Sequence, residues 1–324
     1  MKWKLLLAIL TLLLTALAGA TGTLTVTSPT DGAYLGATNT LSFNVQGATV
    51  EVDVTVTITG PTGGVTTIGP SPFQPDVNGK IAGTIPVNFS QSSPEGAYTI
   101  VVSATENNVA YTPVTINVTV DVTKPKFYSF NPIANSYVKG PDVPIIVKVI
   151  EANLKVWRVQ INSQDIPNNT GTTLDSDNTF TVHWNVSGIL QDGAQTVNID
   201  VKDLAQNDST QSFTVTIDRV APTITIEYPR SDTKVRPNST IAVTVDVSDT
   251  QGSNAVDATG VDVVVQNMSG TQIMRVPRVS FSSGRWTGRI LSSVKLPKQF
   301  KIVASAVDKA GNVGVPQTTV VTVG

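Results

Sequence analysis

The sequence predicts an all-β protein made of three consecutive two-sheet sandwiches, and three observations carry this prediction. Val, Ile and Thr alternate with polar residues at the period of two that half-buried strands require, and no stretch competes with the period of an amphipathic helix. Gly, Pro, Asn and Asp interrupt these runs at short intervals, as turn residues do. The whole pattern then recurs about every hundred residues, three times along the chain.

The first element along the chain is an export signal at residues 1–20. Residues 1–4 carry two lysines, residues 5–18 form an uncharged apolar run, and Ala18-Gly19-Ala20 supplies the small residues that a signal peptidase needs. The run of 14 residues is shorter than the ~20 that span a hydrocarbon core. We therefore expect cleavage after Ala20, with an uncleaved anchor as the alternative, and no membrane span in the mature chain. The protein is expected to be secreted or held at the cell surface or envelope.

The remaining chain divides by its internal repeat. Residues 96–106, 193–203 and 298–308 align as alternating strands that end in an acid, and the end acids lie 203 − 106 = 97 and 308 − 203 = 105 residues apart. About seven short strands in a hundred residues is the size of an Ig-like β-sandwich, and it is longer than a propeller blade or a solenoid repeat. The predicted domains are residues 21–121, 122–218 and 219–324.

Alternation also predicts which side chains fill each core. In the first repeat the inward residues of two strands are Val52, Val54, Val56, Ile58, Tyr98, Ile100, Val102 and Ala104. In the second repeat they are Trp157, Val159, Ile161, Phe180, Val182 and Trp184. Trp286 is expected to take the place of Ile81 and Phe180 in its own repeat. Burial of such a ring contributes about 1.5–3 kcal/mol, which favours a core role over a ligand platform.

Short motifs add a resemblance to a family. Residues 96–106, Gly-Ala-Tyr-Thr-Ile-Val-Val-Ser-Ala-Thr-Glu, resemble the strand DG-x-Y-T-V-x-V-x-A-x-D of bacterial Ig-like domains. Residues 308–312 form the D-x-A-G-N turn of that family, and residues 203–207 are a looser copy. The chain therefore resembles tandem bacterial Ig-like domain proteins. The resemblance implies three tandem Ig-like domains and the roles such arrays have, as surface adhesins, surface-layer components or spacer modules of secreted enzymes.

Composition excludes several classes of function. Lys and Arg number 22 against 24 Asp and Glu, and only 14% of residues are charged, so the chain has no basic excess to follow a phosphate backbone, and nucleic acid is not an expected partner. Without cysteine, thiolate catalysis, Cys-based zinc sites and iron–sulfur clusters are impossible. The single histidine, His183, alternates with core residues of a strand and is expected to face solvent. We therefore predict that the protein is not an enzyme.

The candidate site residues are acids at the junctions between the predicted domains. In an Ig-like sandwich the B–C and F–G loops lie at the end that faces the preceding domain. This places Asp121, Glu151 and Asp203 together at one junction, and the second junction gathers Asp218, Asp249 and Asp308. Calcium takes six to eight hard oxygen ligands, which three carboxylates with carbonyls and water supply. The sequence thus predicts calcium, the only cofactor it suggests, at both junctions.

One observation supports this prediction, and one alternative interpretation of the same acids competes with it. The first repeat has no domain before it, and its matching B–C position holds Ala48, as a junction site requires. The alternative is that these acids serve their turns by bonding nearby backbone N–H groups, or pair in water with Lys124 and Arg219.

The leading functional prediction is an exported, non-catalytic structural or adhesive protein that presents a rigid array of Ig-like domains. Its expected partner is a component of the surface or envelope, or other copies of itself. The alternative is an extracellular module that binds carbohydrate or another polymer, or an accessory protein of a secreted enzyme system. That alternative needs exposed aromatic rings, for which Tyr34 and Tyr137 occupy matching places in two repeats while Lys234 takes the third.

Overall fold

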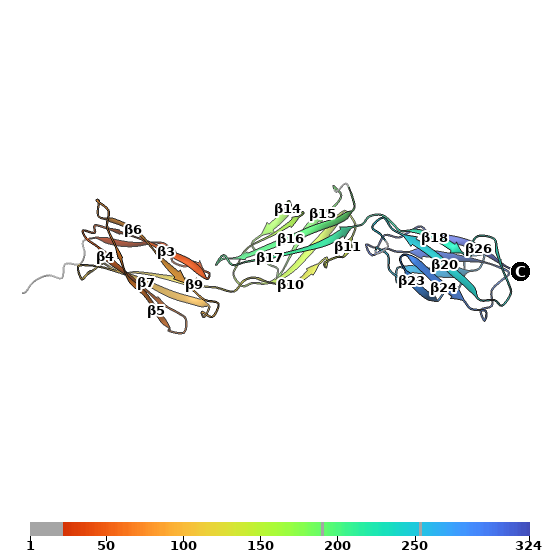
Figure 1. Ribbon diagram of the computed structural model, residues 1–324, viewed down its shortest axis with the longest axis horizontal. Coiled ribbons are helices and arrows are strands. Elements are labelled where there is room, and N and C mark those ends of the chain that lie inside the picture. The colour runs from red at the N-terminus through yellow and green to blue at the C-terminus, as the bar shows by residue number, and fades with distance from the viewer. Residues whose placement is uncertain (1–21, 189–190, 253–254) are drawn as a thin grey trace, which may run out of the picture. The chain divides into compact units, whose positions relative to one another are not determined.

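The computed structural model describes residues 22–188, 191–252 and 255–324, in which strands are joined by turns and loops without a helix (Figure 1). The predicted all-β class is therefore confirmed. The predicted signal peptide at residues 1–20 lies outside the described residues. A search of the described ranges finds no helix with the length and apolar character needed to cross a membrane.

The first set of strands forms two sheets. Its strands are β1 (Thr23–Ser28), β2 (Tyr34–Leu35), β3 (Thr38–Gln46), β4 (Val52–Thr59), β5 (Val65–Phe73), β6 (Lys80–Asn88), β7 (Gly96–Glu106), β8 (Val109–Ala110) and β9 (Val114–Val120). One sheet has the order β1-β3-β6 and the other β2-β9-β7-β4-β5, with β8 paired to β7 off this path.

The second set repeats this plan. Its strands are β10 (Lys126–Asn131), β11 (Tyr137–Val138), β12 (Asp142–Ile150), β13 (Leu154–Ile161), β14 (Gln164–Gly171), β15 (Thr179–Asn185), β16 (Gly193–Asp203) and β17 (Asp208–Ile217). The sheet orders are β10-β12-β15 and β11-β17-β16-β13-β14.

The third set adds one strand to the first of its two sheets. Its strands are β18 (Thr223–Tyr228), β19 (Thr233–Val235), β20 (Ile241–Ser248), β21 (Val261–Gln266), β22 (Gln272–Arg275), β23 (Arg278–Ser282), β24 (Arg285–Ile290), β25 (Gln299–Ala306) and β26 (Gln317–Val323). The sheet orders are β18-β20-β24-β23 and β19-β26-β25-β21-β22.

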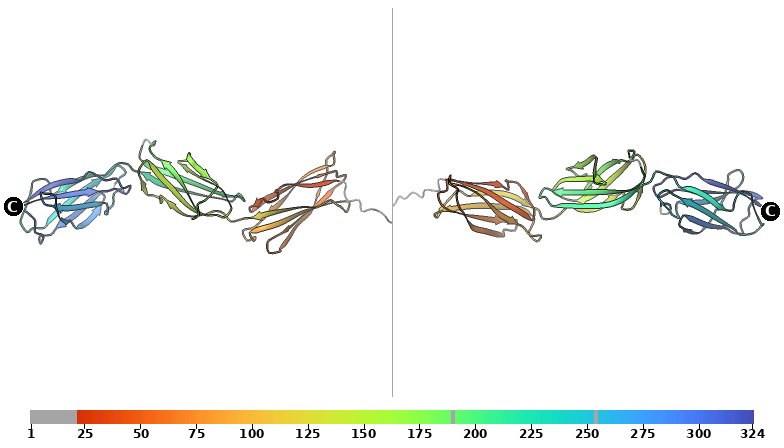
Figure 2. Two further views of the ribbon diagram at one scale, coloured as in Figure 1. Left: turned by 180° about the vertical axis from the view of Figure 1, so that it is seen from behind. Right: turned by 45° about the horizontal axis from the view of Figure 1, so that its top comes forward.

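All three sets share one connectivity. Each set is built of two layers of strands (Figure 2). The first strand of a set lies in one sheet, and the chain then crosses to the other sheet. There the short second strand pairs in parallel with the last strand of the set, as β2 does with β9, β11 with β17 and β19 with β26. Pairing between strands distant in sequence is the arrangement of Ig-like sandwiches. The crossing follows a cis peptide bond before Pro29, Pro132 or Pro229.

The described chain packs into two compact units. The first runs to Lys126 and includes two loops of the second set, Glu151–Lys155 and Val201–Ser209, and the second holds the remaining residues. Each sheet takes its strands from one set alone. The predicted division at residues 121 and 218 into three domains stays a prediction.

The predicted core faces are confirmed. In β7 the residues Tyr98, Ile100, Val102 and Ala104 are all buried, and the inward residues predicted for the strands β4, β13 and β15 are buried as well. Matching core side chains sit in matching register: Ile81 lies opposite Val45, Phe180 opposite Val147, and Trp286 opposite Val245. Trp157 stacks on Phe180 with ring centroids 4.3 Å apart. These aromatic rings are core residues, as predicted.

Candidate metal centres

The second triad of predicted acids lies together in the structure. Asp218 follows β17, Asp249 follows β20 and Asp308 follows β25, so three strand ends deliver them. Each carboxylate offers an oxygen that lies within 4.8 Å of the other two. Asp218 is fully buried and Asp308 is 6% exposed. We call these three residues the Asp218 cluster.

Hydrogen bonds satisfy this cluster only in part. Asn312 donates its backbone N–H and its side-chain Nδ2 to the two oxygens of Asp308, both at 2.8 Å. The backbone N–H of Gln251 bonds Asp249 Oδ1 at 2.8 Å, and that of Val220 reaches Asp218 Oδ1 at 3.3 Å. The Oδ2 atoms of Asp218 and Asp249 are buried without a hydrogen-bond partner. A buried anionic oxygen without a donor is costly unless a cation or a proton meets it.

The electrostatics of the Asp218 cluster follow from this packing. The pKa of Asp218 is raised to about 6, first by burial and then by the nearby negative charges of Asp249 and Asp308. Burial also raises the pKa of Asp249. The guanidinium of Arg219, one alternative partner for Asp218, forms an ion pair with Asp192 through Nε at 2.6 Å. The cluster therefore concentrates negative charge in a partly desolvated place, which is what a hard divalent cation relieves.

The first triad of predicted acids is also brought together. Asp121 follows β9, Glu151 follows β12 and Asp203 ends β16, and their nearest oxygens lie within 4.8 Å of one another. Asp203 is fully buried and Asp121 is 6% exposed. Burial is the main cause that raises the pKa of both Glu151 and Asp203. We call these residues the Asp121 cluster.

The Asp121 cluster has more donors than the Asp218 cluster. Asn207 gives Asp203 a backbone N–H at 2.9 Å and its Nδ2 at 2.8 Å. Asn153 donates its backbone N–H to Glu151 Oε1 at 2.6 Å and its Nδ2 to Asp121 Oδ2 at 2.8 Å. The carboxylates of this cluster therefore meet protein donors at positions where a cation would bind.

Three asparagines in these clusters were not among the predicted site residues. Besides bonding their own aspartates, Asn207 and Asn312 donate Nδ2 to the backbone carbonyls of Asp121 and Asp218, at 2.8 and 2.9 Å. Each thus ties the turn after one strand to the end of another. The signal for them was present, because they are the last residue of the Asp-x-Ala-x-Asn pattern. No pattern in the sequence pointed to Asn153.

The matching corner of the first set has a different chemistry. Glu106, at the end of β7, accepts hydrogen bonds from the backbone N–H and hydroxyl of Thr49, both at 2.6 Å. It also accepts one from the Val50 N–H at 3.0 Å and one from the Tyr111 hydroxyl at 2.7 Å. These donors, with the Thr49 hydroxyl first, lower the pKa of Glu106 to about 2. Ala48 is buried beside them, so this corner holds one stabilised acid and not a triad.

The other predicted functional positions lie elsewhere. His183 is exposed, as predicted, and its Nδ1 lies 2.7 Å from Asp142 Oδ2. Tyr34 and Tyr137 are partly buried. The ammonium of Lys309 lies 5.8 Å from the ring centroid of Tyr137, so one face of this ring is already covered.

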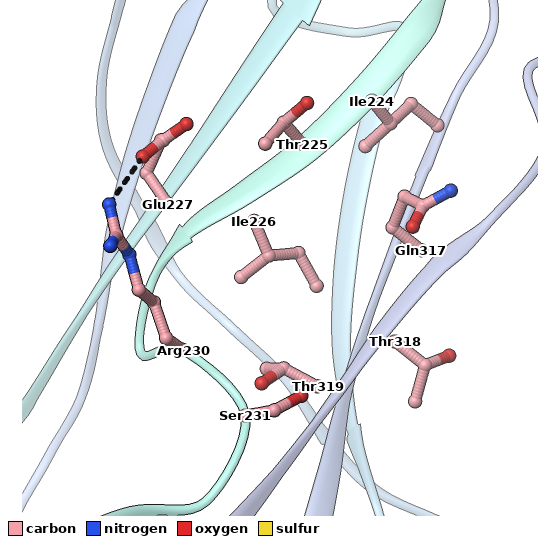
Figure 3. A pocket seen from close by; sticks show the side chains of 9 residues that line it. All are labelled: Ile224, Thr225, Ile226, Glu227, Arg230, Ser231, Gln317, Thr318 and Thr319. Carbon is pink, nitrogen blue, oxygen red and sulfur yellow. Dashed lines mark ion pairs between the residues drawn. The ribbon is translucent and has the colours of Figure 1, made fainter.

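A polar hollow lies between β18 and β26 of the third set (Figure 3). Its volume is about 480 Å³, and Glu227 and Arg230 form an ion pair of 3.5 Å at one side. Thr319 contributes a buried hydroxyl without a hydrogen-bond partner. The lining residues are Ile224, Thr225, Ile226, Glu227, Arg230, Ser231, Gln317, Thr318 and Thr319. Without an aromatic ring in this lining, the hollow lacks the platform on which a sugar ring stacks.

Comparison with known proteins finds likeness in structure alone. No protein-family model and no curated protein matches the chain. Similar solved structures include the fibronectin(III)-like modules of Clostridium thermocellum CbhA, with 15% identity over 61% of this chain and 93% of that one, at a TM-score of 0.40. A tetra-tandem repeat from the extending region of a large adhesion protein has 18% identity over 94% and 74%, at 0.30.

A third similar structure is that of a 1.5-MDa bacterial ice-binding adhesin, described for its host cell surface retention. It shares 19% identity over 94% of this chain and 98% of that one, at a TM-score of 0.29. The three structures are thus fibronectin(III)-like modules, a tandem repeat of a large adhesion protein and a part of a bacterial adhesin. The likeness concerns the kind of fold alone.

Proposed function

We propose that the protein is an exported, non-catalytic structural or adhesive protein whose Ig-like sandwiches are stiffened by calcium at the two acidic clusters. Its place is the cell surface or envelope, and its partner is a surface component or another copy of the chain. The observation that supports the proposal most is the pair of buried, unpartnered carboxylate oxygens on Asp218 and Asp249. A structural acid of a turn is satisfied by its own backbone, and these oxygens are not.

A cation at the Asp218 cluster joins three segments of the chain. Asp218 belongs to the segment after β17, and Asp249 and Asp308 belong to loops of the third set. A ligand that binds only the folded arrangement stabilises it by RT ln(1 + [L]/Kd), which is about 2.7 kcal/mol at a hundredfold excess over Kd. Calcium thereby opposes bending and opening at this point of the chain. In a structural or adhesive protein, such stiffening would keep the sandwiches folded under load and hold a binding surface in place.

Calcium titration of the chain from residue 21 onward tests the proposal. We expect its melting temperature to rise with calcium at millimolar concentration and to return when a chelator is added. Asp308→Ala removes one of the three carboxylates of the Asp218 cluster and erases the gain at that cluster. Asp262→Ala is the matched control, because Asp262 lies outside the clusters and pairs with Arg275. An identical melting curve with and without calcium would disprove the stiffening role.

Surface presentation is tested in the producing cells. An antibody against the chain should detect it in the envelope fraction and not among intracellular proteins. If the partner is another copy of the chain, the purified protein should form assemblies on its own. The alternative of a polymer-binding module predicts retention on insoluble polysaccharide and release by Tyr34→Ala or Tyr137→Ala. The covered face of Tyr137 makes this alternative the less favoured one.

A further inference from the structure

We propose that the two acidic clusters differ in affinity for calcium by about tenfold or more, and that the side-chain amide of Asn153 sets this difference. The inference rests on the proposed function, because it requires the clusters to hold a divalent cation. The Asp218 cluster is the tighter site and fills first. The Asp121 cluster is the weaker site, since one of the oxygens that a cation needs is already hydrogen-bonded.

The two clusters match position by position, which makes them comparable. In both, an asparagine four residues after the last acid donates two hydrogen bonds to that acid. In both, the residue two places after the loop acid donates its backbone N–H to it, at 2.6 Å from Asn153 and at 2.8 Å from Gln251. The matching pairs are Asp121 with Asp218, Glu151 with Asp249, Asn153 with Gln251, Asp203 with Asp308, and Asn207 with Asn312.

Apart from Glu151 standing where the other cluster has Asp249, the clusters differ in the contact of one carboxylate oxygen. In the Asp121 cluster the Nδ2 of Asn153 lies 2.8 Å from Asp121 Oδ2. In the Asp218 cluster the matching oxygen, Asp218 Oδ2, is buried and has no hydrogen-bond partner, and neither has Asp249 Oδ2. A cation entering the Asp218 cluster thus meets two buried oxygens that no donor holds. A cation entering the Asp121 cluster must displace an amide first.

The orientation of Asn153 is fixed by its neighbours. An ionised carboxylate only accepts hydrogen bonds, so the group that Asn153 turns toward Asp121 is its NH2 and not its carbonyl. The backbone N–H of Asn153 is held by Glu151, and its backbone carbonyl accepts the N–H of Leu204 at 2.8 Å. Hydrogen bonds to a charged group are among the stronger ones in proteins, strong enough to change a binding constant tenfold or more when they must be broken.

Isothermal titration of calcium chloride into two single-cluster proteins measures the difference. Asp203→Asn in the chain from residue 21 leaves the Asp218 cluster intact, and Asp308→Asn leaves the Asp121 cluster intact. We expect the Asp203→Asn protein to bind calcium about tenfold or more tightly than the Asp308→Asn protein. Melting in a chelator checks that each variant is folded before titration.

Exchange of the amide tests its role directly. Adding Asn153→Ala to the Asp308→Asn protein frees Asp121 Oδ2, and we expect calcium to bind about tenfold more tightly there. Adding Gln251→Asn to the Asp203→Asn protein places the shorter amide beside Asp218, and we expect weaker binding. The second exchange is independent of the first, so the test survives if Asn153→Ala impairs folding.

The outcomes separate the inference from the function on which it rests. Equal affinities in the two single-cluster proteins overturn the inference and leave calcium binding in place. Weaker binding after Asn153→Ala also overturns it, because Asn153 would then be a ligand through its carbonyl. If neither single-cluster protein takes up calcium, the inference fails together with the proposed stiffening by calcium.

Discussion

The corner that holds Glu106 and the cluster around Asp218 are opposite solutions for a carboxylate at the end of a sandwich. Glu106 accepts four hydrogen bonds and its pKa falls to about 2. Asp218 is fully buried beside two further acids, and its pKa rises to about 6. The donors around an acid therefore decide whether it is a structural hydrogen-bond acceptor or a candidate ligand. Position in the repeat alone does not decide it.

Removal of the Glu106 carboxylate has the largest expected effect. Glu106→Ala leaves the Tyr111 hydroxyl and two backbone N–H groups without their acceptor, and we expect a loss of about 2–4 kcal/mol in the free energy of unfolding. Urea denaturation followed by circular dichroism measures this loss, which should be the same in calcium and in chelator. Glu51→Ala is the control, because Glu51 is an exposed acid of the same set. A loss that appears only with calcium would place Glu106 among the ligands and remove its contrast with Asp218.

Neutralisation of Asp218 has a smaller effect of opposite sign. In chelator, Asp218→Asn removes one of three clustered negative charges from a buried place, and we expect it to raise the free energy of unfolding by about 1–2 kcal/mol. In calcium the same variant should lose the stabilisation that the wild type gains. Thermal melting in both conditions tests this crossing of the two curves, with Asp262→Asn as the control. Destabilisation in chelator would show that Asp218 is a structural acid, as Glu106 is.

Acidification is expected to change the stability contributed by Glu106 by the smallest amount of the three tests. The pKa of Glu106 is lowered from 4.5 to about 2, so its ionised form stabilises the fold fully above pH 4.5. This contribution is lost as pH falls from 4.5 toward 2. The difference in unfolding free energy between wild type and Glu106→Gln should therefore be constant from pH 7 to about 5 and shrink below it. A difference that grows on acidification would contradict the lowered pKa.

Much of the fold could be predicted from the sequence because alternation is a local property. A period of two specifies which side chains face the core, and the repeat places Trp286 opposite Val245 just as Phe180 lies opposite Val147. Both acidic triads could be grouped for a different reason, which is the connectivity of the fold. Strand ends of an Ig-like sandwich meet at one end, so acids at those ends approach one another.

The contacts within the clusters could not be predicted because they depend on side-chain directions. Asn153 and Gln251 have similar chemistry and the same place in the repeat, yet the amide of Asn153 bonds Asp121 while Asp218 Oδ2 has no partner. Lys309 also covers one face of Tyr137, and the alternation of polar and apolar residues cannot predict such a contact between residues distant in sequence. Such pairings follow from the packing of loops, which lack a repeating geometry.

The parallel pairing of β2 with β9 has a consequence for tension along the chain. Tyr34 lies opposite Thr119 and Leu35 opposite Val120, so a strand near the start of the first set runs beside its last strand in the same direction. A force that pulls the two ends of this set apart slides these strands past each other and loads their hydrogen bonds together. Bonds loaded together resist more force than bonds that open one after another. The pairs β11 with β17 and β19 with β26 give the other two sets the same mechanical clamp.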